Sequence, residues 1–245
     1  MPNVKAIVEY DGTDFCGFQI QPSVRTVQGE LERTLKRLFQ IDDINLVGAG
    51  RTDTGVHATG QVVNFEAPDD FPVERVLPAL NDRLPGDIRV KEALEVPESF
   101  HARYSAKART YIYVVLNRQI PSALLGRYTW HITQQLDLDS MRTAAAQLIG
   151  THDFSSFGFP QLKGGSAIRE VSKIRIGTKK NAVFVTIRAN AFLRGMARAM
   201  VGTLVEIGQG KRNPEGIAEV MSARDRQAVR VIAPPQGLYL TRVEY

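Results

Sequence analysis

The alternation of apolar and polar residues predicts that the first half of the chain folds as strand, helix, strand, strand, helix, strand. The strands are expected at Val4–Tyr10, Ile44–Gly48, Gln61–Phe65 and Ile88–Val96. The first helix carries one apolar stripe from Val27 to Phe39, and Thr26 before it suits an N-cap. The second helix follows Pro72 and contains Pro78, which we expect to kink or shorten it.

The second half repeats this order and adds one short helix. Its strands are expected at Thr110–Leu116, Ile168–Ile176, Ala182–Ala189 and Leu238–Val243. One helix is expected to begin at Asp139 as N-cap and to end at Gly150, with Leu148 and Ile149 facing inward. Another is expected from Phe192 to Ile207, with Arg194 and Arg198 off its apolar face. Asn213-Pro214 starts the additional helix.

Two β-α-β-β-α-β units in tandem predict an α+β fold with two ferredoxin-like domains, at residues 1–105 and 106–245. Each domain is expected to be a largely antiparallel sheet with helices on one face. The domains are expected to flank a central cleft. Asp53 would enter that cleft from the loop between the second and third strands of the first domain.

Charge separates the two halves more clearly than the net charge of +5 suggests. Residues 1–105 hold 11 Lys and Arg against 17 Asp and Glu, which gives −6; residues 106–245 hold 20 against 9, which gives +11. The positive charge of residues 106–245 indicates either a binding surface for a polyanion such as nucleic acid or a basic surface that is simply solvated.

Composition also bounds the compartment and the cofactor chemistry. No apolar run approaches the roughly 18 residues of a membrane span, and the chain starts directly with a strand pattern, so we expect a cytoplasmic protein without membrane attachment. A single cysteine, Cys16, excludes an internal disulfide and a cysteine-based zinc site. The scattered histidines lack metal-ligand spacing, and no phosphate-binding glycine loop or nucleophilic serine elbow is present.

The segment from Gly48 to His57 is the most informative stretch of the chain. It places the carboxylate of Asp53 on a glycine-flanked turn, two residues after Arg51. A strand pattern follows, which excludes a dinucleotide site at a helix N-terminus. Asp53 and Arg51 fit either a loop-stabilising pair or a carboxylate kept ionised for nucleophilic attack.

Two other groups of residues allow both a structural and a chemical interpretation. Tyr111 and Tyr113 share one face of a strand, where tyrosines pack in a core or, on an open sheet face, stack on bases or move a proton. Arg194 and Arg198 are either a solvated pair or the source of a guanidinium that pairs with a carboxylate of the other domain.

Over essentially its whole length, the chain resembles the tRNA pseudouridine synthase A family. The blocks that carry the resemblance are Tyr10-Asp11-Gly12-Thr13 with Gly17, Gln19 and Gln21; Gly50 to His57; Phe100-His101-Ala102-Arg103 leading to Arg109-Thr110-Tyr111; Phe192-Leu193 with Met196, Arg198 and Val201 to Leu204; and Ala233 to Leu240. The block around Asp53 is highly specific, and the others gain weight from their order and spacing.

The resemblance implies an enzyme that converts uridine to pseudouridine at positions 38, 39 and 40 in the anticodon stem-loop of tRNAs. Asp53 would be the nucleophile, attacking either the ribose C1′ or the uracil ring. Arg51 would enter the base stack as the target base flips out. Tyr111 would accept or relay a proton, Arg198 would pair with the catalytic carboxylate, and Leu238 would form an apolar wall of the uracil pocket.

The resemblance further implies a homodimer that binds tRNA across both subunits, with no metal, no nucleotide and no other cofactor. Two features depart from the family pattern: Phe15 and Phe18 replace the usual Tyr and Trp, and Arg194-Gly195-Met196-Ala197 is atypical. Two other classes fit parts of the sequence, namely a non-catalytic RNA-binding module and a small-molecule enzyme on ferredoxin-like domains. Whether Tyr111 or a water takes the proton stays open.

Overall fold

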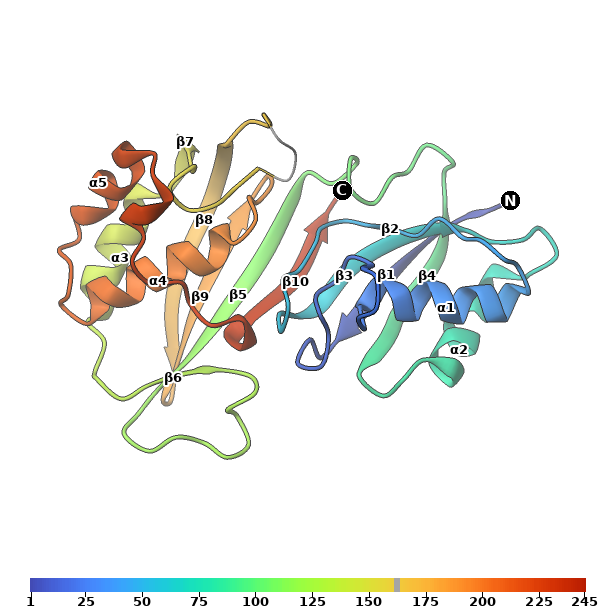
Figure 1. Ribbon diagram of the computed structural model, residues 1–245, viewed down its shortest axis with the longest axis horizontal. Helices are drawn as coiled ribbons and strands as arrows, with labels where there is room; N and C mark the ends of the chain where they lie inside the picture. The colour runs from blue at the N-terminus through green and yellow to red at the C-terminus, as the bar shows by residue number, and fades with distance from the viewer. Residues whose placement is uncertain (161–163) are drawn as a thin grey trace. The chain divides into compact units, whose positions relative to one another are not determined.

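The computed structural model describes residues 1–160 and 164–245. The chain divides into two compact units (Figure 1). Unit 1 comprises Met1–Lys107 together with Leu240–Tyr245, and unit 2 comprises Ala108–Tyr239. These bounds differ from those of the two expected domains, because the last six residues return to unit 1.

Unit 1 contains the expected order of strands and helices (Figure 1). Its elements are β1 (Asn3–Tyr10), α1 (Val27–Phe39), β2 (Val47–Gly48), β3 (His57–Glu66), α2 (Val73–Arg83) and β4 (Ile88–Val96). The Thr26 side chain accepts a hydrogen bond from the Gly29 amide at 3.2 Å, which confirms the predicted N-cap of α1. Helix α2 runs through Pro78 to Arg83, so this proline does not shorten it.

The sheet of unit 1 is antiparallel, with strand order β4-β1-β3 and β2 on β3. This is the ferredoxin-like arrangement that the sequence predicts. The end of β10 (Leu238–Glu244) also lies beside β3. Val4, Ala6 and Val8 alternate as fully buried residues along β1, and α1 buries Leu31 and Leu35 in the same unit. Complete burial of a leucine side chain stabilises a fold by roughly 1.5–3 kcal/mol.

Unit 2 contains the expected elements and two short strands that the sequence pattern does not indicate. Its elements are β5 (Ala108–Asn117), β6 (Trp130–Ile132), α3 (Leu138–Gln147), β7 (Gly150–Asp153), β8 (Ile168–Lys179), β9 (Ala182–Ala189), α4 (Met196–Gly208), α5 (Gly216–Ala223), the 3-10 turns η1 (Arg226–Ala228) and η2 (Pro235–Gly237), and the start of β10. The sheet runs β5-β9-β8-β7 with antiparallel neighbours, and β6 adds in parallel to β5.

Both long helices of unit 2 begin elsewhere than expected. Asp137, not Asp139, caps α3, because its carboxylate accepts the amides of Asp139 and Ser140 at 3.0 and 3.1 Å. The Ser140 hydroxyl and amide lower the pKa of Asp137. Ile149 is 43% exposed and does not face the core, contrary to the prediction.

Helix α4 begins at Met196, after Gly195 in the left-handed conformation at φ 75°, and not at Phe192. Arg194 therefore lies outside the helix. Every residue of α4 is buried apart from Arg198, whereas the sequence predicted one apolar face. Such a helix forms the centre of its unit rather than a cover over it. None of the helices described in residues 1–160 and 164–245 is long and apolar enough to cross a membrane.

Candidate active site

The loop 49–56 joins β2 to β3 and carries Asp53. β2 and β3 are an antiparallel pair in which Val47 faces Asn64 and Gly48 faces Val63. The pairing continues into the loop, where the Ala49 amide donates to the Val62 carbonyl at 2.8 Å. The Gln61 side chain donates to the Gly50 carbonyl at 2.8 Å. The base of the Asp53 loop is therefore an extension of the sheet.

A second segment, Tyr10–Phe18, holds the Asp53 loop from its other side. The Phe18 amide donates to the Thr52 carbonyl at 3.1 Å, and the hydroxyls of Tyr10 and Thr52 lie 2.8 Å apart. Thr52 is thus fixed through both backbone and side chain, directly before Asp53. Since Thr52 is only 6% exposed, these hydrogen bonds form away from water and constrain the loop strongly.

The Tyr10–Phe18 segment also contacts the end of the Asp53 loop, where Gly12 lies against Val56. A Cβ at Gly12 would overlap the Val56 carbonyl, so only glycine permits this close approach. The Gly12 amide donates to Nδ1 of His57, which is 2% exposed, at 3.0 Å. Gly55 turns the loop at φ 76°, and the Val56 amide donates to the Asp53 carbonyl at 3.1 Å. The sequence blocks around Tyr10 and Asp53 therefore form one structural assembly.

Tyr10 contacts the Asp53 loop through Thr52, whereas sequence reasoning placed it only within a motif. Burial raises the pKa of Tyr10 to about 12, while hydrogen bonds with Thr52 and Gln61 act in the opposite direction. Its hydroxyl therefore stays protonated at neutral pH and is a stable partner for Thr52. The sequence signal for it is the Tyr-Asp-Gly-Thr block, in which Tyr10 is the last residue of β1.

Asp53 is half-buried, between buried Thr52 and exposed Thr54. Arg51 is exposed. The hydrogen bonds that hold the loop involve Ala49, Gly50 and Thr52, so its conformation does not depend on a contact between Arg51 and Asp53.

In unit 2, Tyr111 and Tyr113 lie on the buried face of the sheet. β5 pairs with β9 so that Tyr111 is opposite Ile187 and Tyr113 opposite Val185, and all four side chains are buried. Burial of both rings excludes base stacking on an open sheet face, and it leaves a proton-transfer role only to a hydroxyl that reaches the substrate. Tyr111 is 7% exposed and packs edge-on against Phe192, with ring centroids 4.8 Å apart.

Tyr113 and Arg198 meet the segment 233–238 within unit 2. The Tyr113 hydroxyl donates to the Pro234 carbonyl at 2.8 Å. The pKa of Tyr113 is raised, because burial outweighs the opposing effect of the positive charge of Arg198. Arg198 donates from Nε to the Ala233 carbonyl at 2.7 Å, while the Ala233 amide donates to the Arg198 carbonyl at 3.0 Å. These paired hydrogen bonds fix the guanidinium against the chain that leads to Leu238.

Leu238 is the first residue of β10 and is 5% exposed. The turn η2 precedes it, and a Cβ at Gly237 would come within 2.6 Å of the Tyr113 ring. Arg198, Tyr113 and the 233–238 segment are thus packed together in unit 2. Asp53 and Arg51 belong to unit 1, and Tyr111, Arg198 and Leu238 to unit 2.

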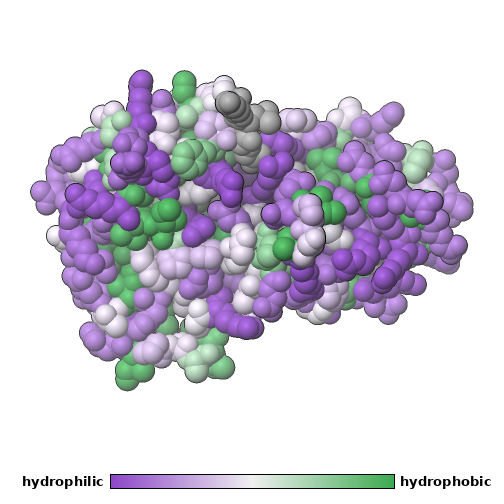
Figure 2. Space-filling model, in the orientation of Figure 1, coloured by the Kyte–Doolittle hydropathy of each residue, from purple (hydrophilic) through white to green (hydrophobic). Residues whose placement is uncertain are grey.

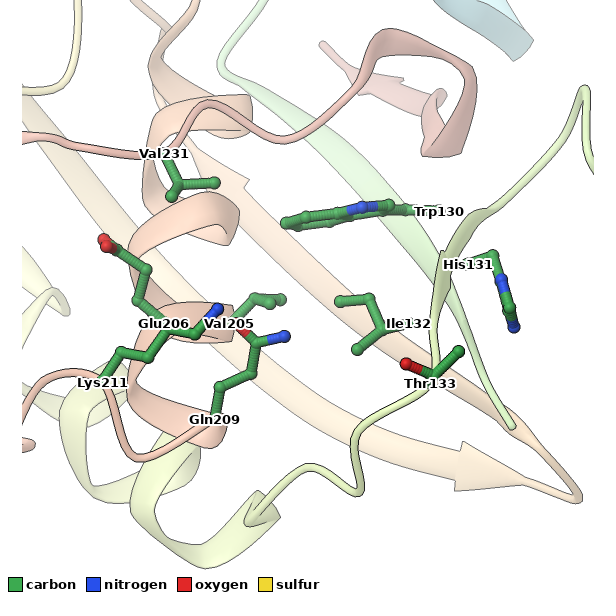
Figure 3. Close-up of a pocket in the computed structure, with 9 residues that line it drawn as sticks. All are labelled: Trp130, His131, Ile132, Thr133, Val205, Glu206, Gln209, Lys211 and Val231. Atoms are coloured by element: carbon green, nitrogen blue, oxygen red, sulfur yellow. The ribbon is translucent and has the colours of Figure 1, made fainter. Parts of the chain in front are cut away.

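A separate cavity of about 290 Å³ lies in unit 2 (Figure 3). Its lining residues are Trp130, His131, Ile132, Thr133, Val205, Glu206, Gln209, Lys211 and Val231. None of the predicted site residues lines it. Among the described residues, no group of His, Cys, Asp and Glu side chains is arranged to hold a metal ion.

Comparison with known proteins identifies the family. The sequence pattern of the tRNA pseudouridine synthases matches residues 6–105 and 144–245. A tRNA pseudouridine synthase A of Halalkalibacterium halodurans is 47% identical over 238 residues, which cover 97% of this chain and 90% of that protein. The chain belongs to the tRNA pseudouridine synthase family. A tRNA pseudouridine synthase A of a Thermoanaerobacter species is 43% identical over the full length of both chains.

Family membership establishes an isomerase that converts uridine to pseudouridine in tRNA. It also confirms the predicted pseudouridine synthase fold. A chain in the crystal structure of a Cbf5-Nop10-Gar1 complex has a TM-score of 0.41 and 12% identity, over 97% of this chain and 48% of that one. That similarity is too low to support a conclusion. Membership excludes the two rival classes, a non-catalytic RNA-binding module and a small-molecule enzyme.

Proposed function

We propose that this synthase modifies uridines at positions 38, 39 and 40 of the tRNA anticodon stem-loop, with Asp53 as its nucleophile. The double anchoring of the Asp53 loop carries the assignment of the nucleophile, and the family resemblance in the sequence carries the three tRNA positions. β3 holds its base through Ala49 and Gln61, and the Tyr10–Phe18 segment holds Thr52 and Val56. A carboxylate fixed in this way needs little reorganisation before it reacts.

The reaction is an isomerisation in which atoms and electrons balance within the nucleoside. The bond between ribose C1′ and uracil N1 breaks, and a bond between C1′ and C5 forms. C5 loses a proton and N1 gains one, so no oxidant, metal or nucleotide is part of the proposal. Asp53 attacks C1′ or the uracil ring and is regenerated when the rotated base is rejoined.

The other site residues have complementary proposed roles. Arg51 is exposed at the start of the loop, which suits a guanidinium that fills the space left by a flipped base. Tyr111 relays a proton, and Leu238 supplies an apolar wall to the uracil. Arg198 pairs with the catalytic carboxylate, and the hydrogen bond from its Nε to the Ala233 carbonyl holds the guanidinium in place.

The proposed catalytic role predicts a separation of chemistry from binding. Asp53→Asn keeps the size of the side chain but removes the nucleophile, so pseudouridine formation should fall below detection. Its affinity for tRNA should stay close to wild type, because the basic surface supplies most of the binding. Thr54→Ala, at the exposed neighbouring position, is the matched control and should retain activity.

Two measurements test this prediction: chemical mapping of pseudouridine in treated tRNA and a tRNA titration at fixed salt concentration. Formation of pseudouridine by Asp53→Asn would remove Asp53 from the mechanism. Equal loss of activity and affinity would assign Asp53 to binding or to folding.

We also propose that the enzyme acts as a homodimer in the cytoplasm, where tRNA is available. The support for a dimer is the loop 118–129 between β5 and β6, the apolar loop. Ile120 and Leu124 are 74% and 84% exposed, and Leu125 and Tyr128 are also exposed. Figure 2 shows hydrophobic side chains at the lower left, where this loop lies in Figure 1. Such clustering of exposed apolar residues is typical of protein interfaces.

A further inference from the structure

The turn formed by Phe100–Ser105 in unit 1 presents an aromatic ring to solvent. Tyr104 is 76% exposed, whereas its neighbour Ala102 is fully buried. A tyrosine that remains so exposed gains little free energy from burial. Packing in the monomer therefore does not explain the aromatic side chain at this position.

The turn itself is rigidly held. The Ser105 amide donates to the His101 carbonyl at 2.9 Å, and the His101 amide donates to the Ser105 hydroxyl at 3.1 Å. Nδ1 of His101 accepts the amides of both Arg103 and Tyr104 at 3.2 Å. Because the histidine ring closes the turn, its position relative to Tyr104 is fixed.

Three side chains from outside the turn attach it to the body of unit 1. Asn3 donates from its side chain to the Phe100 carbonyl at 2.9 Å. The Asn64 side chain accepts the Ala102 amide at 2.8 Å, and the Tyr245 hydroxyl donates to the Ala102 carbonyl at 2.8 Å. The turn is thus bonded to β1, to β3 and to the C-terminal residue.

Two rings on this turn lie against each other in a tilted arrangement. His101 and Tyr104 have ring centroids 4.4 Å apart and planes inclined by 33°. The Arg103 guanidinium lies 5.5 Å from the centre of the Tyr104 ring. An exposed aromatic ring next to a cation combines the two groups that bind unpaired nucleotides, namely a flat surface for the base and a positive charge for the phosphate.

We propose that Tyr104 is a stacking platform for an unpaired base of the tRNA substrate, outside the catalytic loop. The base would stack on the Tyr104 ring, and Arg103 would lie beside its phosphate. Since the platform is rigid before binding, little conformational entropy is lost when the base arrives. Stacking accepts every base, so this contact contributes affinity rather than sequence selection.

The inference rests on tRNA as the substrate, which family membership establishes, and not on the proposed role of Asp53. The stacking role of Tyr104 and the catalytic role of Asp53 predict different defects when the residue is replaced. Loss of the platform weakens tRNA binding while saturated turnover continues; loss of the nucleophile abolishes turnover while binding continues.

The test compares Tyr104→Ala with Tyr104→Phe, using unmodified tRNA transcript as the probe. Alanine should weaken tRNA binding about 5- to 160-fold, the range found when a stacking aromatic is removed. It should raise KM by a similar factor with little change in kcat. Phenylalanine keeps the ring and should bind like wild type. Leu94→Ala, which removes a 42% exposed side chain from β4 of the same unit, is the matched control.

Ultraviolet crosslinking adds a readout that a structural role would not produce. Wild type and Tyr104→Phe should crosslink to tRNA through the peptide that contains residue 104, and Tyr104→Ala should not. Wild-type affinity of Tyr104→Ala, or the absence of a crosslink in that peptide, overturns the proposal. A change of oligomeric state in Tyr104→Ala with unchanged tRNA affinity also overturns it and assigns the ring to a protein interface.

Discussion

Hydrogen bonds order both the Asp53 loop (49–56) and the apolar loop (118–129), but the two loops differ in whether their apolar side chains are buried. Backbone and side-chain hydrogen bonds fix both: Thr52 is bonded to Phe18 and Tyr10, and Thr129 donates its hydroxyl to the Leu125 carbonyl at 2.9 Å. The apolar side chains of the two loops differ in exposure. Val56 is 2% exposed in the first loop, whereas Leu124 is 84% exposed in the second.

The difference shows what each loop is built to meet. A loop that buries its own apolar residues is complete by itself and can hold a polar group such as Asp53 in a constant position. A loop that is ordered but leaves its apolar residues outside is completed only by another surface. We therefore expect changes beneath the Asp53 loop to affect chemistry, and changes on the apolar loop to affect association.

The largest effect is expected for Gly12→Ala. The new methyl group would overlap the Val56 carbonyl, so the Tyr10–Phe18 segment and the Asp53 loop must move apart. Overpacking of this kind costs about 1–3 kcal/mol of stability, and a displacement of about 1 Å at the nucleophile lowers kcat roughly 100-fold. Single-turnover pseudouridine assays and thermal unfolding measure the two effects.

Gly50→Ala is the control in the same loop. A Cβ at Gly50 meets no atom within 4 Å, and its backbone is outside the left-handed region. It should retain near wild-type turnover. If Gly12→Ala is as active as Gly50→Ala, close packing beneath the loop does not position Asp53.

The next effect concerns the apolar loop. Leu124→Arg places a charge at the most exposed apolar side chain of that loop and should weaken the dimer at least tenfold, by about 1.4 kcal/mol or more. Sedimentation over a range of protein concentrations measures this change. Ile149→Arg, at a 43% exposed position of the same unit, should leave association unchanged. An unaltered dimer in Leu124→Arg would exclude this loop as the interface.

The smallest effect is expected for Tyr10→Phe, which removes one buried hydrogen bond at a cost of about 1 kcal/mol at neutral pH. The effect of this substitution on the pH dependence of stability is expected at alkaline pH. Tyr10 has a pKa of about 12 in the folded chain against 10.0 for an ordinary tyrosine, so between these values the folded state binds more protons. Stability therefore falls as pH rises from 10 to 12, by up to about 3 kcal/mol.

Urea unfolding at a series of pH values should show a weaker alkaline decline in Tyr10→Phe than in wild type. Part of the decline should persist, because burial also raises the pKa of Tyr113. An identical pH dependence in the two proteins would mean that the Tyr10 hydroxyl is accessible to water.

The sequence predicted those elements whose signals are local. Thr26 and the apolar stripe behind it defined α1 to the residue, because cap and stripe act within one helix. The start of α3 was wrong by two positions, since Asp137 and Asp139 suit an N-cap equally well and only geometry selects between them. Strands of three or four residues such as β6 and β7 are too short to show a periodic pattern in the sequence. They are defined by their pairing with a neighbouring strand, for example of Trp130 with Val115.

The candidate site shows the same division. The motif around Asp53 predicted its turn, but not that Tyr10 and Gly12 hold it, because those contacts span more than 40 residues. Helix α4 was extended too far toward Phe192, whose ring belongs with Tyr111. Tertiary contact thus overrode a helical pattern that was correct from Met196 onward.

The return of Leu240–Tyr245 to unit 1 has a consequence for synthesis on the ribosome. The Lys107 amide donates to the Glu244 carbonyl at 2.7 Å, and Tyr245 bonds the turn at Ala102. Although nascent domains commonly fold in order of emergence, the unit that carries Asp53 lacks part of its sheet until residues 240–245 have been added, after the whole of unit 2. A polypeptide that stops before Leu240 therefore leaves the earlier-made unit without this strand.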